Sequence, residues 1–201
     1  NKILLVGTKG LLPKKPYFIS EYLDNTHYKM ECIKTRIKEY AYFKSKNPNL
    51  ENPIICLVGS PGVGKSTIAS SIAKSLHRDF YKISLGGLSD TAELLGHRRT
   101  YLGSAPGKII SAIQKCGSKN PVILFDEVDK MGHENKGDPA SVLLDVLDPN
   151  LNQIFTDAYL EEPFDLSHTL FILTANYIQD IPIELRDRLE IIELSSYTTL
   201  E

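Results

Sequence analysis

The 201-residue sequence predicts an α/β fold with a five-stranded parallel sheet, helices on both faces and an N-terminal helical arm. Two observations support this prediction. Short apolar runs alternate along the chain with segments whose apolar residues recur at helical spacing. Several of the runs are continuously apolar, which is typical of parallel strands that are buried on both faces.

Each element follows from its local pattern. Five mainly apolar runs are expected to be strands: 54–58, 80–85, 122–125, 169–174 and 190–194. The segments between them repeat apolar residues at three- and four-residue steps and are expected to be helices: 65–76, 92–95, 106–116, 140–147 and 183–188. Ligands of such sheets bind at the carboxyl ends of the strands.

The part of the chain before the first strand has a different character. Residues 24–43 have helical spacing and 44–53 are rich in Asn and Pro, so we expect a helix followed by a loop. Residues 1–20 are expected to be a linker or arm from an upstream region, and 21–201 to form one unit. Because the chain begins with Asn1 rather than methionine, we expect it to be part of a longer protein.

Composition narrows the class of protein. The net charge of −2 and the absence of a basic stripe give no footprint for nucleic acid, and no apolar run approaches the roughly 20 residues of a membrane helix. The three cysteines are widely spaced, and Cys56 lies inside an apolar run. This usage favours a reducing compartment over a disulfide framework or a cysteine metal site.

The stretch "GSPGVGKS" at 59–66 fits the pattern G-x-x-x-x-G-K-[ST] between an expected strand and an expected helix. Its glycines permit backbone angles that let successive N–H groups face a phosphate. Lys65 would place a charge on the outer phosphates, and Ser66 offers a hydroxyl to Mg²⁺. The expected nucleotide-binding residues here are Gly59, Ser60, Pro61, Gly62, Val63, Gly64, Lys65, Ser66 and Thr67.

Two carboxylates follow the third expected strand. Asp126 falls at its carboxyl end, where it could hold Mg²⁺, and Glu127 falls at its exit, where it could polarise an attacking water. Asp129 and Lys130 are interpreted as part of a solvated turn.

The same edge of the sheet receives further polar groups. Asn176 follows the fourth strand, and its amide could contact the water or the γ-phosphate. Arg186 and Arg188 precede the last strand, where one could be an arginine finger, although two arginines in a polar turn are more often surface residues.

The sequence resembles the ATPase module of the Lon proteases, which are AAA+ enzymes built on the P-loop NTPase fold. The resemblance covers roughly residues 21–198. The most specific stretches are "ELLGHRRTYLGSAPGKII" and "GDPASVLLDVLDPNLNQIFTDAYLEEPFDLS", with "LDNTHY", "GSPGVGKS", "NPVILFDEVDKM" and "LRDRLEII" beside them.

The resemblance implies roles for the nucleotide site. Lys65 and Ser66 resemble the Walker A lysine and Mg²⁺ ligand, and Asp126 and Glu127 the Walker B pair, with Glu127 as the catalytic residue. Asn176 resembles sensor 1.

It also implies roles at a distance from the phosphate loop. Arg188 resembles the arginine finger that acts on the neighbouring subunit's nucleotide, and His27 and Tyr28 match a motif that lines the adenine pocket. Tyr101 and Leu102 match the aromatic pore loop, and an exposed aromatic ring can grip an extended chain regardless of its sequence.

Two departures are mild: Ser60 stands where the family usually has proline, and Leu102 where it has a β-branched residue. The family continues into a small helical subdomain and a Ser-Lys protease domain, and neither is in this sequence. The resemblance implies a hexameric ring for the full-length protein. Because the chain alone lacks the small helical subdomain, we expect it to be monomeric and a weakly active ATPase.

The resemblance implies ATP or ADP and Mg²⁺ as cofactors, unfolded or damaged proteins as substrates, and a location in the cytoplasm, or in the mitochondrial matrix of a eukaryote. A P-loop small-molecule kinase is the alternative enzyme. The alternative without catalysis is a pure binding module, which would bind DNA or protein in a nucleotide-dependent way.

Overall fold

The computed structural model describes residues 19, 21–24, 30–88, 90–131 and 137–194. Its main sheet has five strands in the order β2-β3-β6-β1-β7, and every neighbouring pair is parallel. The bounds are β1 Ile55–Val58, β2 Phe80–Ser84, β3 Val122–Asp126, β6 Leu170–Ala175 and β7 Glu190–Glu193. The predicted five-stranded parallel sheet is therefore confirmed, each strand within about a residue of its expected place.

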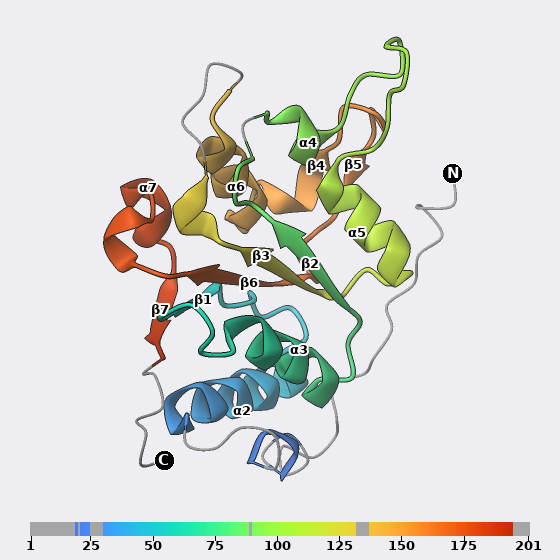
Figure 1. Cartoon of the computed structure of the whole chain (residues 1–201). Helices are drawn as coiled ribbons and strands as arrows, with labels where there is room; N and C mark the ends of the chain where they lie inside the picture. The colour runs from blue at the N-terminus through green and yellow to red at the C-terminus, as the bar shows by residue number, and fades with distance from the viewer. Residues whose placement is uncertain (1–18, 20, 25–29, 89, 132–136, 195–201) are drawn as a thin grey trace.

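Helices cover both faces of this sheet, as Figure 1 shows. On one face lie α2 (Glu31–Lys46) and α3 (Lys65–Ser75), and on the other lie α4 (Ala92–Leu95), α5 (Lys108–Cys116), α6 (Pro139–Leu147) and α7 (Ile183–Arg186). None of the helices in the described part of the chain is long and apolar enough to cross a membrane.

The strands feed two separate cores because successive side chains point to opposite faces. In β3, Val122 and Leu124 pack in the core beneath α2 and α3, whereas Ile123 and Phe125 pack in the core beneath α4, α5 and α6. All four side chains are fully buried. Cys56 lies in the second core, and burial raises the pKa of its thiol to about 12, so it behaves as the small hydrophobic residue that we predicted.

The structure corrects some element boundaries. The arm helix, expected over 24–43, is α2 at Glu31–Lys46, since Met30 before it has a left-handed φ of 68°. The helix expected from 106 begins at Lys108, because the residue before it is in extended conformation. A short antiparallel ribbon of β4 (Phe155–Thr156) and β5 (Pro163–Phe164) was not expected. Single 3-10 turns span Val128–Lys130, Asn152–Ile154 and Ile178–Asp180.

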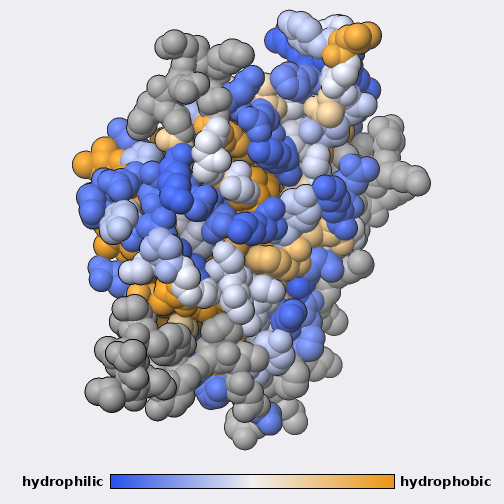
Figure 2. Space-filling model, in the orientation of Figure 1, coloured by the Kyte–Doolittle hydropathy of each residue, from blue (hydrophilic) through white to orange (hydrophobic). Residues whose placement is uncertain are grey.

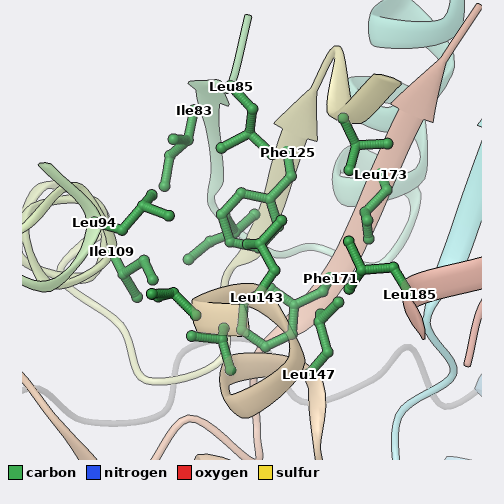
Figure 3. Packing of buried hydrophobic residues seen from close by; sticks show 14 of the residues in the cluster. Ile83, Leu85, Leu94, Ile109, Phe125, Leu143, Leu147, Phe171, Leu173 and Leu185 are labelled. Carbon is green, nitrogen blue, oxygen red and sulfur yellow. The ribbon is translucent and has the colours of Figure 1, made fainter. Parts of the chain in front are cut away.

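Aromatic packing stabilises the larger core. Phe125 of β3 and Phe171 of β6 stack with ring centroids 5.6 Å apart and an interplanar angle of 10°. Figure 3 shows both rings facing Leu143 and Leu147 of α6. This pair therefore joins two central strands to the helix that covers them.

Replacing Phe171 with alanine should lower the free energy of unfolding by about 3–5 kcal/mol, because it removes a buried ring and leaves a cavity. Urea denaturation of the 201-residue chain measures this loss. Phe43 is a matched control, since it lies 55% exposed on α2, and Phe43→Ala should change stability by no more than about 0.5 kcal/mol. Equal losses for the two variants would contradict this account of the core.

Candidate nucleotide-binding and hydrolysis site

The phosphate loop connects β1 to α3 at the carboxyl edge of the sheet. Gly62 and Gly64 have φ of 84° and 90°, which is the left-handed region that glycine tolerates. Gly59 is required for a different reason than the one expected. A Cβ there would lie 2.6 Å from the carbonyl oxygen of Leu194, so this position needs close backbone packing rather than a special φ.

Lys65 begins α3 and folds back over its own loop. Its ammonium group donates to the carbonyl of Gly59, to the carbonyl of Ser60 at 3.1 Å and to the Oδ1 atom of Asn176 at 2.9 Å. The structure thus brings Lys65 and Asn176 together. This agrees with the prediction that both residues lie at the carboxyl edge of the sheet. Desolvation lowers the pKa of Lys65, although the carboxylates of Asp129, Asp126 and Glu127 oppose this effect.

Asp126 lies at the end of β3 and has three side-chain partners. Its Oδ1 accepts from Ser66 Oγ at 3.3 Å and from Thr174 Oγ1 at 2.5 Å, and its Oδ2 pairs with Lys82 Nζ at 2.5 Å. Burial favours the neutral acid, but the hydrogen bonds from Lys82, Thr174 and Ser66 outweigh it and lower the pKa of Asp126. The carboxylate is therefore ionised at neutral pH.

The donor set around Asp126 suits a hard cation. Ser66 and Asp126 place a hydroxyl and a carboxylate oxygen next to each other, and Mg²⁺ prefers oxygen ligands and commonly shares them with substrate phosphates. The residues present therefore fit the expected metal.

Glu127 leaves β3 with a left-handed backbone, at φ 63° and ψ 51°. Such a conformation costs a non-glycine residue about 1–3 kcal/mol and needs support. The Glu127 N–H donates to Thr174 Oγ1 at 3.0 Å, and Lys130 donates to its Oε1. A Cβ atom on Gly86 would lie only 2.6 Å from the Oε2 atom of Glu127. The absence of a side chain at Gly86 therefore leaves room for the carboxylate of Glu127.

Asp129 was interpreted as part of a solvated turn, and this interpretation is wrong. Its Oδ2 accepts from the backbone N–H of Asn176 at 2.9 Å, across 47 residues. Its Oδ1 is buried and has no hydrogen-bond partner among the residues that the structure describes. Asp129 therefore helps to hold Asn176 at the site, whereas Lys130 is half exposed and pairs with Glu127.

Sequence reasoning also missed Thr174 and Lys82. Thr174 contacts Asp126 and Glu127 together, and Lys82 neutralises Asp126 from the neighbouring strand β2. Both interrupt apolar runs, and a polar residue inside a buried strand is the signal that could have identified them.

The two arginines near α7 differ in their surroundings. Arg186 donates to the carbonyls of Gln179 and Ile181, at 3.1 and 2.9 Å, and so ties α7 to the preceding turn. Arg188 pairs with Asp148, with Nη1 to Oδ2 at 2.7 Å and its side chain 42% exposed. Within the described residues it has no hydrogen bond to the group around Lys65.

A second predicted feature lies away from the nucleotide site. The loop between α4 and α5, at 97–106, extends beyond the body of the molecule in Figure 1. Tyr101 is 67% exposed and Leu102 is fully exposed. Figure 2 shows hydrophobic surface at the tip of this loop beside hydrophilic surface. His27 and Tyr28, expected at the adenine pocket, lie outside the described residues.

Comparisons with known proteins agree with this geometry. Residues 55–197 match the family model described as "ATPase family associated with various cellular activities (AAA)". The Lon protease of Ureaplasma parvum is 53% identical over 183 residues, which are 91% of this chain and 23% of that protein. The Lon protease of Halothermothrix orenii is 56% identical over 176 residues, 88% of this chain and 22% of that protein. The chain thus spans about a quarter of the length of these relatives.

A solved structure shares the fold. A chain from a closed-state cryo-EM reconstruction of Hsp104 with ATPyS and FITC casein superposes with a TM-score of 0.74 at 18% identity, over 91% of this chain and 36% of that chain. The matches give no support to the small-molecule kinase alternative. Since the family model spans every strand of the main sheet together with Lys65, Asp126, Glu127 and Asn176, the chain belongs to the AAA family of ATPases, and its sequence corresponds to the ATPase module of the Lon proteases.

Proposed function

We propose that this chain converts ATP hydrolysis into the unfolding and translocation of protein substrates, as the motor module of a Lon-type protease. The observation that carries the proposal is the joint presence, in one α/β unit, of the group of polar residues around Lys65 and an exposed aromatic loop at Tyr101. The similarity to proteins named Lon protease supports it.

In this proposal the phosphate loop, from Gly59 to Thr67, binds the phosphates of ATP or ADP. Lys65 exchanges its carbonyl partners in the loop for phosphate oxygens while it keeps contact with Asn176. Ser66 and Asp126 would hold Mg²⁺, which would neutralise charge on the phosphates. His27 and Tyr28 would contact the adenine.

Glu127 is proposed to orient and polarise the attacking water. Thr174 fixes its backbone, and Gly86 leaves space for its carboxylate. Because Lys130 pairs with the same carboxylate, Glu127 must release or share this partner when it acts on water. Asn176, fixed by Asp129, would contact the γ-phosphate or the water from the other side.

Arg188 is proposed to complete the nucleotide site of a neighbouring subunit in a hexameric ring. Its position near the last strand, and its pairing with Asp148 rather than with the Lys65 group among the described residues, support action on another chain. The substrates are proposed to be unfolded or damaged proteins, delivered to a Ser-Lys protease domain of the full-length protein. Residues 1–20 are proposed to be a linker, and the location to be the cytoplasm, or the mitochondrial matrix in a eukaryote.

Replacing Tyr101 with alanine tests whether the exposed loop couples ATP hydrolysis to the unfolding of substrates. In the full-length protein, the degradation of a folded substrate per ATP hydrolysed should fall about tenfold or more, because the loop loses its large contact surface. Degradation of a stable fluorescent protein and phosphate release are measured in the same reaction. Tyr42→Ala is the matched control, since Tyr42 is 48% exposed on α2, far from the loop in sequence. Unchanged coupling in Tyr101→Ala would refute the proposed role of the loop.

A further inference from the structure

The projecting loop at 97–106 has an unusually tight base. It leaves α4 at Gly96 and returns to α5 at Gly107, and these two residues are in contact. A Cβ on Gly96 would lie 2.8 Å from the nitrogen of Gly107, and a Cβ on Gly107 would lie 2.0 Å from the carbonyl oxygen of Leu94. Gly96 and Gly107, the two stems of the loop, therefore approach each other more closely than residues with side chains would allow.

A buried carboxylate lies against this base. Asp157, on the β4–β5 ribbon, has an exposed fraction of 0%. Its Oδ2 accepts from the N–H of Gly107 at 2.7 Å, and its Oδ1 accepts from Tyr159 and Leu160 at 2.8 and 3.1 Å. Burying a carboxylate is costly unless it receives several hydrogen bonds, and this one receives three from backbone groups.

The same turn also contacts the end of α4 and the loop itself. The N–H of Ala158 donates to the carbonyl of Leu95 at 2.7 Å. Arg99, within the loop, donates from Nε to the carbonyl of Tyr159 at 2.6 Å, and its guanidinium lies 5.1 Å from the centre of the Tyr159 ring. Residues 157–159 thus contact the chain at both ends of the loop, at Leu95 and Gly107, and also Arg99 within the loop. Figure 1 shows β4 and β5 close to α4 and the start of the loop.

This turn belongs to the chain segment that leads to the nucleotide site. After β5, the N–H of Leu166 bonds to the carbonyl of Asn152, and the chain then enters β6, which ends at Ala175, one residue before Asn176. Asp157 therefore contacts the base of the loop from the segment of chain that leads into β6 and on to Asn176, which contacts Lys65. An asparagine could not reproduce the contacts of Asp157, because it has one acceptor oxygen and its NH₂ group would face an N–H donor.

We propose that Asp157 is a positioning residue that fixes the Tyr101 loop to the segment leading into β6, so that the loop moves together with the nucleotide site. The inference rests on the proposed function, in which this loop grips polypeptide. The carboxylate touches neither nucleotide nor substrate, and it acts by holding the stems of the loop in one orientation.

The experiment compares Asp157→Asn with Asp165→Asn in the full-length protein. Asp165 also accepts a backbone N–H, from Ser167 at 2.9 Å, but it is exposed and follows β5 away from the loop. A nitroxide attached at Leu102→Cys, in protein whose accessible cysteines are replaced, reports the mobility of the loop. Unlabelled protein reports folded-substrate degradation per ATP hydrolysed, at temperatures well below the unfolding temperature of each variant.

In Asp157→Asn the nitroxide should become more mobile, and degradation per ATP should fall about tenfold. Asp165→Asn should change neither quantity. A purely structural role would lower the unfolding temperature of Asp157→Asn without changing nitroxide mobility or coupling, and that result would overturn the proposal.

A second variant keeps the test decisive if Asp157→Asn does not fold. Arg99→Gln removes an exposed contact of the same turn, and unchanged nitroxide mobility in it would overturn the proposal. Failure of the proposed function gives a different result. In that case Tyr101→Ala would leave coupling unchanged, whereas the nitroxide would still report whether Asp157 fixes the loop.

Discussion

Replacing Glu127 with glutamine is expected to lower ATP turnover by the full-length protein about 10²–10⁴-fold, the usual contribution of a general base. The amide has nearly the shape of the carboxylate, so the left-handed backbone and the hydrogen bond to Thr174 should persist. In the proposed mechanism the phosphate loop and Lys65 bind the nucleotide, so nucleotide binding should remain. The variant should therefore separate binding from hydrolysis.

Phosphate release measures the turnover, and binding of a fluorescent ATP analogue measures the affinity. Glu161→Gln is a close control, because Glu161 also has a left-handed backbone, at φ 58°, and is exposed outside the nucleotide site. It should retain full turnover. Undiminished turnover in Glu127→Gln would exclude Glu127 as the catalytic residue and would direct attention to Asp126 or Asp129.

The sequence was sufficient to predict the groups that form contiguous motifs. Lys65 and Ser66 follow the first expected strand across the glycine-rich loop, and Asp126 and Glu127 come directly after the third expected strand, so placing the strands also placed these side chains at one edge. The position of Asn176 at the same edge was predicted by the same argument, and its contact with Lys65 confirms that position, whereas its role toward the nucleotide stays a prediction.

The residues that were missed act across the sheet or between distant loops. Lys82 reaches Asp126 only because β2 and β3 are neighbours, and strand order does not follow from local patterns. Asp129 looked like any acid in a turn until its bond to the Asn176 backbone was seen. Asp157 lies 50 residues from its partner Gly107, and no spacing rule links the two. Local propensity predicts elements, whereas these contacts depend on tertiary packing.

The roles predicted for the individual site residues all stay predictions, including those of His27, Tyr28 and Arg188. The adenine contacts of His27 and Tyr28 lie outside the described residues. The role of Arg188 requires a second subunit, and in the chain by itself this side chain pairs with Asp148. The hydrogen bond from Arg188 lowers the pKa of Asp148, assisted by the backbone N–H groups of Asn150 and Leu151. The ionised carboxylate of Asp148 is therefore the partner of Arg188 in the chain by itself.

Replacing Arg188 with alanine is expected to lower turnover about 10³-fold in the assembled protein, the lower end of the range for an arginine finger. Nucleotide affinity should change little, because within the described part of the chain Arg188 forms its hydrogen bond with Asp148 and none with the phosphate loop. Arg36→Ala is the control, since Arg36 is also a partly exposed arginine in an ion pair, with Glu190 at 2.5 Å. It should retain turnover within about twofold, because surface ion pairs contribute little.

Mixing two inactive variants decides whether Arg188 acts on a neighbour. A subunit with Arg188→Ala keeps its own Glu127, and a subunit with Glu127→Gln keeps its own Arg188. If the arginine acts across the interface, rings assembled from both variants contain some complete sites, formed by Glu127 of one subunit and Arg188 of the next. Their ATP turnover should then exceed the sum of the two separate variants. If the arginine acts within its own chain, every site in the mixed ring lacks one group, and mixing would restore nothing.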